Sequence, residues 1–142
     1  MWRYWSGAPK TIRLVVGVQV AVLSYGGVVH VVQLATGGWP PYQWAPAWLA
    51  SYFVSLTVFD FLAAALLWAR RTSGLYLSIL ILVTDAAANG YAVYGLPGAA
   101  ETARYSQAII SLLALAAVIT APRVRRWMKR GADTRTPHRR LS

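Results

Sequence analysis

The sequence predicts an all-α membrane protein, an antiparallel bundle of four transmembrane helices with both chain ends in the cytoplasm. Three observations lead to this prediction: the composition, four long apolar segments and the distribution of basic residues. Of the 142 residues, 57% are hydrophobic and 13% are charged, whereas a soluble domain carries roughly 45–50% and about 25%. An ordinary soluble enzyme with a charged surface is therefore excluded. The absence of cysteine excludes disulfide, iron–sulfur and thiolate-zinc chemistry.

Four apolar segments are long enough to cross a bilayer, whose hydrocarbon core needs about 20 helical residues. The predicted spans are residues 14–35, 47–69, 74–95 and 103–121, which together form one transmembrane domain over residues 1–122. Glycine and proline residues gather in the connections between the spans. Because these connections are short, neighbouring helices are expected to pack against each other in opposite directions.

The basic residues are distributed unequally between the two sides of the predicted bundle. All 14 lysine and arginine residues except Arg104 lie before the first span, between the second and third spans, or after the fourth. The positive-inside rule places that side in the cytoplasm. The tryptophans fall at span ends, in connections or in tails, as expected for aromatic belts at the two interfaces. We expect the membrane to be the cytoplasmic membrane of a bacterium.

Residues 123–142 are predicted to form a basic cytoplasmic tail that is disordered. Its first part is expected to contact anionic lipid headgroups, with about 1 kcal/mol from each basic residue. The predicted headgroup contacts are Arg123, Arg125, Arg126, Lys129 and Arg130. Because this run begins directly after a span, topology and lipid contact account for it, and nucleic acid is not expected as a partner.

Three ionisable residues fall inside the predicted spans: His30, Asp60 and Asp85. A central aspartate costs about 2.5–3.5 kcal/mol on insertion scales, so a functional interpretation is the default. At about 1.5 Å per residue, Asp60 lies roughly 13 Å and Asp85 roughly 16 Å from the cytoplasmic edge. The two carboxyl groups could face each other near the midplane. At least one is then expected to be protonated at pH 7, because two buried like charges repel.

Each span also carries a narrow stripe of polar or small residues, which predicts a polar bundle interior. The candidates for binding a ligand or a proton are Asp60, Asp85, Asn89, His30, Gln107 and Ser111. A structural role is the alternative for the uncharged members, because amides and hydroxyls pair across membrane helices to hold them together. Asn89, one turn beyond Asp85, could simply orient that carboxyl group.

The uncharged, aromatic connection over residues 38–46 is expected to lie flat on the membrane interface as an anchor. A lid over a ligand is the alternative interpretation of this segment. No phosphate-binding loop, nucleophile elbow or His-Glu-x2-His motif is present in the sequence. His30 has no partner at a metal-ligand spacing, so neither a metal nor a cofactor is expected.

The sequence leaves three functions open. The first is binding or proton-coupled transport of a small solute through the polar interior, for which a homodimer would be needed. The second is a non-catalytic membrane subunit whose buried polar groups specify helix packing and whose tail contacts lipid or a partner. The third is an intramembrane enzyme on a lipid-soluble substrate, with an aspartate as general acid, and an enzyme is less expected than the other two.

Overall fold

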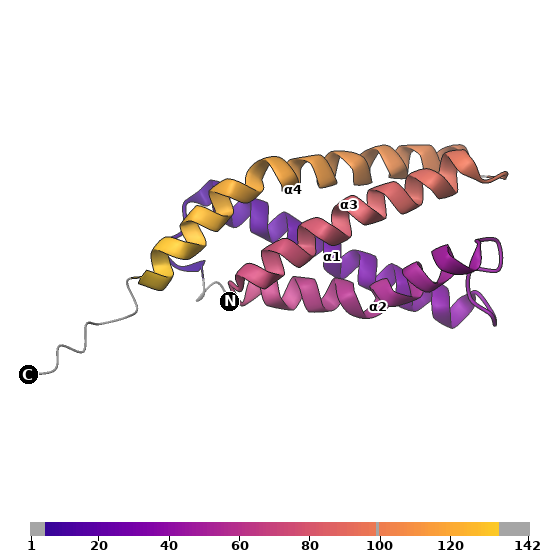
Figure 1. Ribbon diagram of the computed structural model, residues 1–142, viewed down its shortest axis with the longest axis horizontal. Coiled ribbons are helices and arrows are strands. Elements are labelled where there is room, and N and C mark those ends of the chain that lie inside the picture. Colours follow the sequence, from indigo (N-terminus) through magenta and orange to yellow (C-terminus); the bar gives the residue numbers. More distant parts are fainter. Residues whose placement is uncertain (1–4, 99, 134–142) are drawn as a thin grey trace, which may run out of the picture.

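The computed structural model describes residues 5–98 and 100–133, and these residues form four α-helices and no β-strand (Figure 1). The helices are α1 (Lys10–Thr36), α2 (Ala47–Trp68), α3 (Thr72–Gly95) and α4 (Glu101–Asp133). By length and composition, each of the four could cross a membrane. The predicted all-α class and the four apolar helices are therefore confirmed.

Proline sets the start of the first two helices. Pro9 and Pro46 precede α1 and α2 in an extended conformation, and neither can donate the backbone hydrogen bond that would extend the helix backwards. The first helix therefore takes in the polar residues from Lys10 onward, which lie before the apolar run that predicts a span from residue 14. The second and third helices begin and end close to their predicted limits.

The fourth helix does not end at residue 121 as predicted. It continues through Pro122 to Asp133, and it curves on its way to that end (Figure 1). A proline inside a helix removes one hydrogen bond and bends the axis. Val124 and Met128 are buried beyond it, so packing keeps the segment helical. The predicted disorder of the tail is wrong over residues 123–133, and residues 134–142 lie outside the described residues.

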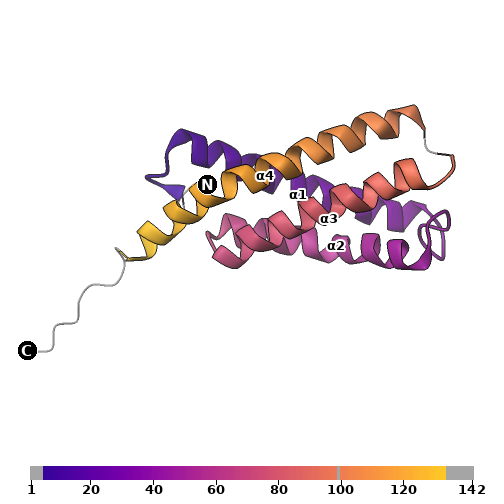
Figure 2. The same cartoon turned by 45° about the horizontal axis from the view of Figure 1, so that its top comes forward.

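Each helix packs mainly against its neighbours along the chain, α1 with α2, α2 with α3, and α3 with α4 (Figures 1 and 2). The first and fourth helices meet in an apolar cluster at the basic end, where Ile12 and Val16 of α1 share a core with Val124 and Met128 of α4. Farther along, an apolar groove of about 210 Å³ runs between α1 and α4. The bundle is thus joined at one end and parted between α1 and α4 over the rest.

Tryptophans hold the joined end together. Trp5 is completely buried, its indole N–H donates to the backbone oxygen of Trp68 (2.9 Å), and its ring stacks on Trp127 with centroids 5.0 Å apart. The guanidinium of Arg70 lies over the ring of Trp127, 3.9 Å from its centroid. Arg70 also donates to the backbone oxygen of Met128 (3.3 Å). Residues from α2, α4 and the segment before α1 are therefore fixed to one another.

The connection between α2 and α3 requires a residue without a side chain. A Cβ atom at Gly74 would lie 2.3 Å from the backbone nitrogen of Leu67 and 2.4 Å from the carbonyl carbon of Leu66. Only glycine allows two backbones to come this close.

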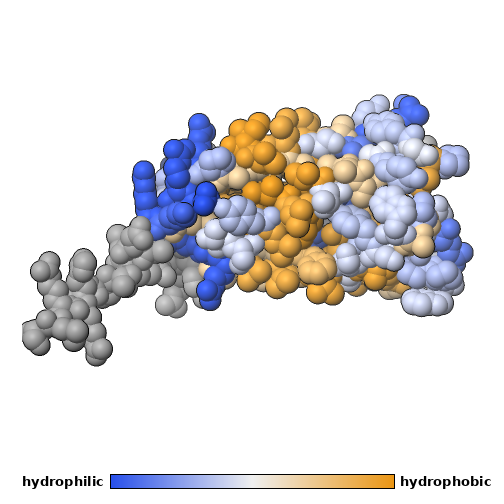
Figure 3. Space-filling view, in the orientation of Figure 1, coloured by the Kyte–Doolittle hydropathy of each residue, from blue (hydrophilic) through white to orange (hydrophobic). Residues whose placement is uncertain are grey.

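The outer surface of the bundle is apolar, and Figure 3 shows a hydrophobic band across the helices with more hydrophilic residues at both ends. An apolar band of this kind suits contact with lipid.

Candidate functional site

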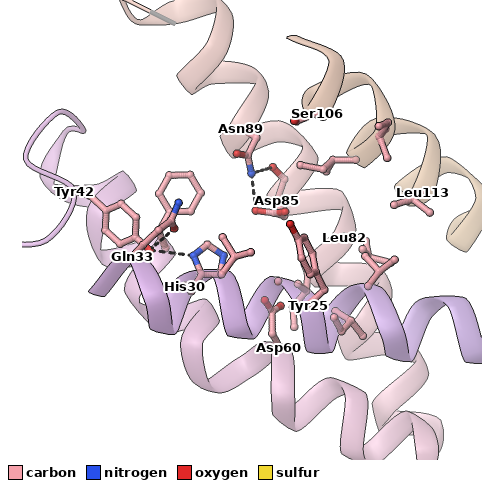
Figure 4. A pocket seen from close by; sticks show the side chains of 18 of the residues that line it. Tyr25, His30, Gln33, Tyr42, Asp60, Leu82, Asp85, Asn89, Ser106 and Leu113 are labelled. Atoms are coloured by element: carbon pink, nitrogen blue, oxygen red, sulfur yellow. Dashed lines mark hydrogen bonds between the residues drawn. The ribbon is translucent and has the colours of Figure 1, made fainter. Parts of the chain in front are cut away.

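One cavity of about 500 Å³ brings together residues from all four helices and from the α1–α2 connection. Its polar lining residues are His30, Gln33, Asp60, Asp85, Asn89 and Ser106, and its other walls are aromatic and aliphatic. Four of the six residues predicted to bind a ligand or a proton therefore share one space. Figure 4 shows His30 on α1, Asp60 on α2, and Asp85 with Asn89 on α3 around this space.

Asp60 lies in the wall of the cavity with no hydrogen-bond partner among the described residues. Its side chain is only 4% exposed, and it forms no ion pair within residues 5–98 and 100–133. Gly26 of α1 makes room for it, because a Cβ atom at that position would lie 2.8 Å from Asp60 Oδ2. A buried polar group without a partner costs free energy. The fold therefore holds this carboxyl group in the cavity, and no described residue offers it a hydrogen bond or an opposite charge.

Asp85 is half-buried and has a partner on its own helix. The side-chain amide of Asn89 donates to Asp85 Oδ1 (2.8 Å) and to the Asp85 backbone oxygen (3.0 Å). Asn89 thus orients the carboxyl group, as one of the two sequence interpretations has it, and it also lines the cavity. No hydrogen bond joins Asp60 to Asp85 in the described part of the chain, although both extend into the same space (Figure 4). That one of them carries a proton at pH 7 stays a prediction.

His30 is held by a side chain from the connection that follows α1. The hydroxyl of Tyr42 donates to Gln33 Oε1 (3.0 Å) and lies 3.0 Å from His30 Nδ1. Because the hydroxyl hydrogen is used by Gln33, His30 Nδ1 must donate to the Tyr42 oxygen. A neutral His30 then carries its proton on Nδ1 and keeps Nε2 as an acceptor. Figure 4 shows this second nitrogen on the side of the ring away from Tyr42.

The α1–α2 connection closes one end of the cavity with Tyr42 and Trp44. Tyr42 is 8% exposed, and its ring packs on Phe53 of α2 with centroids 5.3 Å apart. Burial raises the pKa of Tyr42, so its hydroxyl keeps its hydrogen. Trp39, by contrast, is 88% exposed. The connection therefore does more than lie flat on an interface, and the role of Tyr42 is missing from the sequence prediction because no local pattern marks a loop tyrosine as buried.

Gln107 and Ser111 do not line the cavity. The side-chain amide of Gln107 donates to the backbone oxygen of Ala86 on α3 (2.7 Å) and to the hydroxyl of Ser111 (3.2 Å). Gln107 thus ties α4 to α3, which is the packing role that the sequence left open, and Ser111 is its partner on the same helix. Ser106, one residue before Gln107, is the polar group that α4 contributes to the cavity. A shift of one position on a helix turns a side chain by about 100°, since there are 3.6 residues per turn.

The cavity is open between α1 and α4. The exposed lining residues are Tyr25 (72%) and Gln33 of α1, Ser106 and Ile109 (59%) of α4, and Trp44 (61%) of the α1–α2 connection. Those on α1 and α4 flank the part of the bundle where these two helices are no longer joined. On the side toward the basic end, Leu82 and Leu113 line the cavity and the tryptophan cluster lies beyond them. The exposed lining thus extends along the flank between α1 and α4, from Tyr25 and Ile109 to Gln33 and Ser106.

The five basic residues predicted to contact lipid headgroups lie on the last turns of α4 and are all exposed. They alternate with the inward-facing Val124, Trp127 and Met128, so the helix end is amphipathic. The guanidinium of Arg125 also lies 5.9 Å from the ring centre of Tyr76 on α3. This end of the molecule thus presents positive charge at the edge of the apolar band.

Comparison with known proteins adds no family to these observations. No protein-family model, no curated protein and no solved structure matches this chain. Within residues 5–98 and 100–133, no group of three histidine, cysteine, aspartate or glutamate side chains is placed to hold a metal ion.

Proposed function

We propose that this protein is an integral membrane protein that binds a small molecule in the cavity between its helices and carries it across the membrane in exchange for protons. One observation supports this most directly: a cavity of about 500 Å³ gathers His30, Asp60, Asp85 and Asn89 from three helices. Small-molecule sites have volumes of roughly 300–1,000 Å³ and few, well-placed polar groups. The cavity has this size and this character.

The state of Asp60 favours a functional role over a structural one. A carboxyl group kept for packing would be expected to bond to a neighbouring helix, as the side chain of Gln107 does. Asp60 has no such bond in the described residues, yet it lines the cavity. A proton or a positively charged ligand would compensate it. Exchange between these two occupants would couple ligand movement to protons, with Asp85 as the second acceptor in the same space.

Binding can be tested before a natural ligand is known, by filling the cavity. Gly26→Leu adds a side chain that points at Asp60, and the matched control Ala108→Leu adds the same side chain on an exposed face of α4. A compound library is screened by thermal unfolding in detergent. A ligand at 100 times its Kd adds about 2.7 kcal/mol to stability. We expect hits with the wild type and with Ala108→Leu but not with Gly26→Leu, and equal shifts in all three proteins would contradict binding in the cavity.

Transport is tested with purified protein in lipid vesicles. Once a ligand is identified, its uptake is measured with and without an imposed pH gradient. The double variant Asp60→Asn plus Asp85→Asn is expected to abolish the part of the uptake that depends on protons. Unchanged proton-dependent uptake in that variant would refute transport by this mechanism.

We further propose that the helices cross a bacterial cytoplasmic membrane in alternating directions, with both chain ends in the cytoplasm and with anionic lipids at the end of α4. The basic residues support this, because all but Arg104 belong to the first 13 residues, to the α2–α3 connection, or to the end of α4 and the residues after it. The contacts of Trp5 with Trp68 and Trp127 join these same three regions. A single cytoplasmic side would then hold nearly all the positive charge.

A further inference from the structure

We infer that the ligand of this cavity is an organic cation with an apolar body, such as a protonated amine or a quaternary ammonium compound, and that it reaches the cavity from the lipid phase. This inference rests on the proposed function and names the class of molecule that the site would take. Three features of the cavity lead to it: its charge, its walls and its opening.

The charge of the cavity can only be negative or neutral while His30 is neutral. Asp60 and Asp85 line it, and no lysine or arginine does. An anionic ligand would meet two carboxyl groups without a compensating cation, which is costly in a low-dielectric space. A cation would instead provide the partner that Asp60 lacks among the described residues. The cation would lie near Asp60, which is 4% exposed and lines the cavity.

The walls suit an apolar, positively charged molecule. Tyr42, Trp44, Phe53 and Tyr25 contribute aromatic rings to the lining, and three of them form one group, with ring centroids of 5.3 Å for Tyr42–Phe53 and 6.2 Å for Trp44–Phe53. The faces of such rings attract cations. A neutral, sugar-like molecule fits less well, because it needs many hydrogen-bond partners. The amide of Asn89 is already bonded to Asp85.

The opening suits a molecule that dissolves in the bilayer. Two of its exposed lining residues, Tyr25 and Ile109, belong to the apolar flanks of α1 and α4, and the others, Gln33, Trp44 and Ser106, lie toward the α1–α2 connection and the start of α4. In a membrane these flanks face acyl chains, so a ligand that passes between them must be stable there. The apolar groove next to the cavity, lined by Leu14 and Val18 of α1 and Ala116 of α4, continues the same lateral path. Amphiphilic cations concentrate at such a location because their bodies are apolar.

A set of three probes with one shared body tests the charge requirement. An alkylphenyl group carries a trimethylammonium cation, an uncharged tert-butyl group of the same shape, or a sulfonate anion. Binding to the purified protein in nonionic detergent is measured by equilibrium dialysis against empty micelles. We expect saturable binding of the cation, at least roughly tenfold weaker binding of the neutral probe, and no binding of the sulfonate.

Variants connect this selectivity to the named residues. Asp60→Asn should weaken binding of the cationic probe at least roughly tenfold and leave binding of the neutral probe unchanged. Glu101→Gln removes the same charge at an exposed position on α4 and should change neither. Trp44→Leu, at the exposed part of the cavity wall, should weaken binding of the cationic probe more than binding of the neutral probe. This second variant keeps the inference testable if Asp60→Asn fails to fold.

The outcomes separate this inference from the proposed function. If the neutral probe or the sulfonate binds as tightly as the cation, and Gly26→Leu abolishes that binding, the cavity is a ligand site and the inference about the cation is wrong. If Glu101→Gln weakens the cation as much as Asp60→Asn does, the charge acts at long range and the inference is also overturned. If none of the three probes binds saturably, the inference and the proposed binding function are both contradicted.

Discussion

Replacing Tyr42 with phenylalanine should destabilise the protein through a single oxygen atom. In the wild type, this hydroxyl bonds to Gln33 Oε1 and accepts from His30 Nδ1, both at 3.0 Å. Tyr42 also has a φ of 55°, a left-handed conformation that costs about 1–2 kcal/mol for a residue other than glycine. The hydroxyl bonds and the packing on Phe53 hold the connection in this conformation.

The size of the effect follows from the number of bonds lost. Each net hydrogen bond contributes about 0.5–1.5 kcal/mol, so losing two costs about 1–3 kcal/mol. His30 is buried, and its unpaired N–H places the loss toward the upper part of that range. We expect about 2 kcal/mol, which is roughly a thirtyfold change in the unfolding constant. In the variant, the backbone at position 42 can relax and regain part of the free energy that the left-handed conformation costs. This gain limits how far the free energy of unfolding falls.

The assay is reversible unfolding in mixed micelles of sodium dodecyl sulfate and a nonionic detergent, followed by far-UV circular dichroism. Tyr25→Phe is the matched control, because Tyr25 also lines the cavity but is well exposed and has no hydrogen bond among the described residues. It should change stability by less than about 0.5 kcal/mol. If Tyr42→Phe unfolds with the same free energy as Tyr25→Phe, the bridge between His30 and Gln33 does not stabilise the fold and the reasoning is refuted.

Three further predictions concern other parts of the molecule. Gly74→Ala should destabilise the protein by at least about 1–3 kcal/mol in the same assay, because its Cβ would meet backbone atoms of α2 at 2.3 Å; an unfolding free energy equal to the wild type's would contradict the close approach. At pH 9, Asp60→Asn should raise stability by about 1 kcal/mol or more, since it removes an uncompensated carboxylate, and a lower unfolding free energy would assign Asp60 a structural role. Single cysteines in this cysteine-free chain report topology: in intact cells a membrane-impermeant maleimide should label Gln43→Cys and not Ser73→Cys, and the reverse pattern would overturn the proposed orientation.

The number and type of the helices could be predicted because both depend on the length of apolar segments. The end of α4 could not be predicted in this way. A hydropathy average ends the span where the arginines after Pro122 begin, and it does not register the helical spacing of Val124 and Met128. Those two side chains are one helical turn apart and share a core with Trp5. Only tertiary packing decides that this segment stays helical, and no local window of the sequence includes its partner at the other end of the chain.

The site residues that the sequence predicts best are ionisable groups inside an apolar span, because their position is itself unusual. His30, Asp60 and Asp85 stand out because charged groups inside a span are costly, and all three line the cavity. Gln107 was grouped with them because it shares a helix face with other polar residues, yet it bonds to the α3 backbone. Helical periodicity gives the direction of a side chain on its own helix, but it does not say whether that direction meets a neighbouring backbone, as for Gln107, or a cavity, as for Ser106.

The stack of Trp5 on Trp127 has a consequence for biosynthesis. It joins the first and last parts of the described chain, so the bundle cannot complete its assembly until the end of α4 has left the ribosome. Until then, the apolar surface that Leu67 and Leu75 share with Trp5 is without its cover from α4. A nonsense mutation just after Pro122 would therefore yield a product that has all four spans but lacks the α4 side of this apolar cluster. Such a product is a substrate for membrane quality-control proteases.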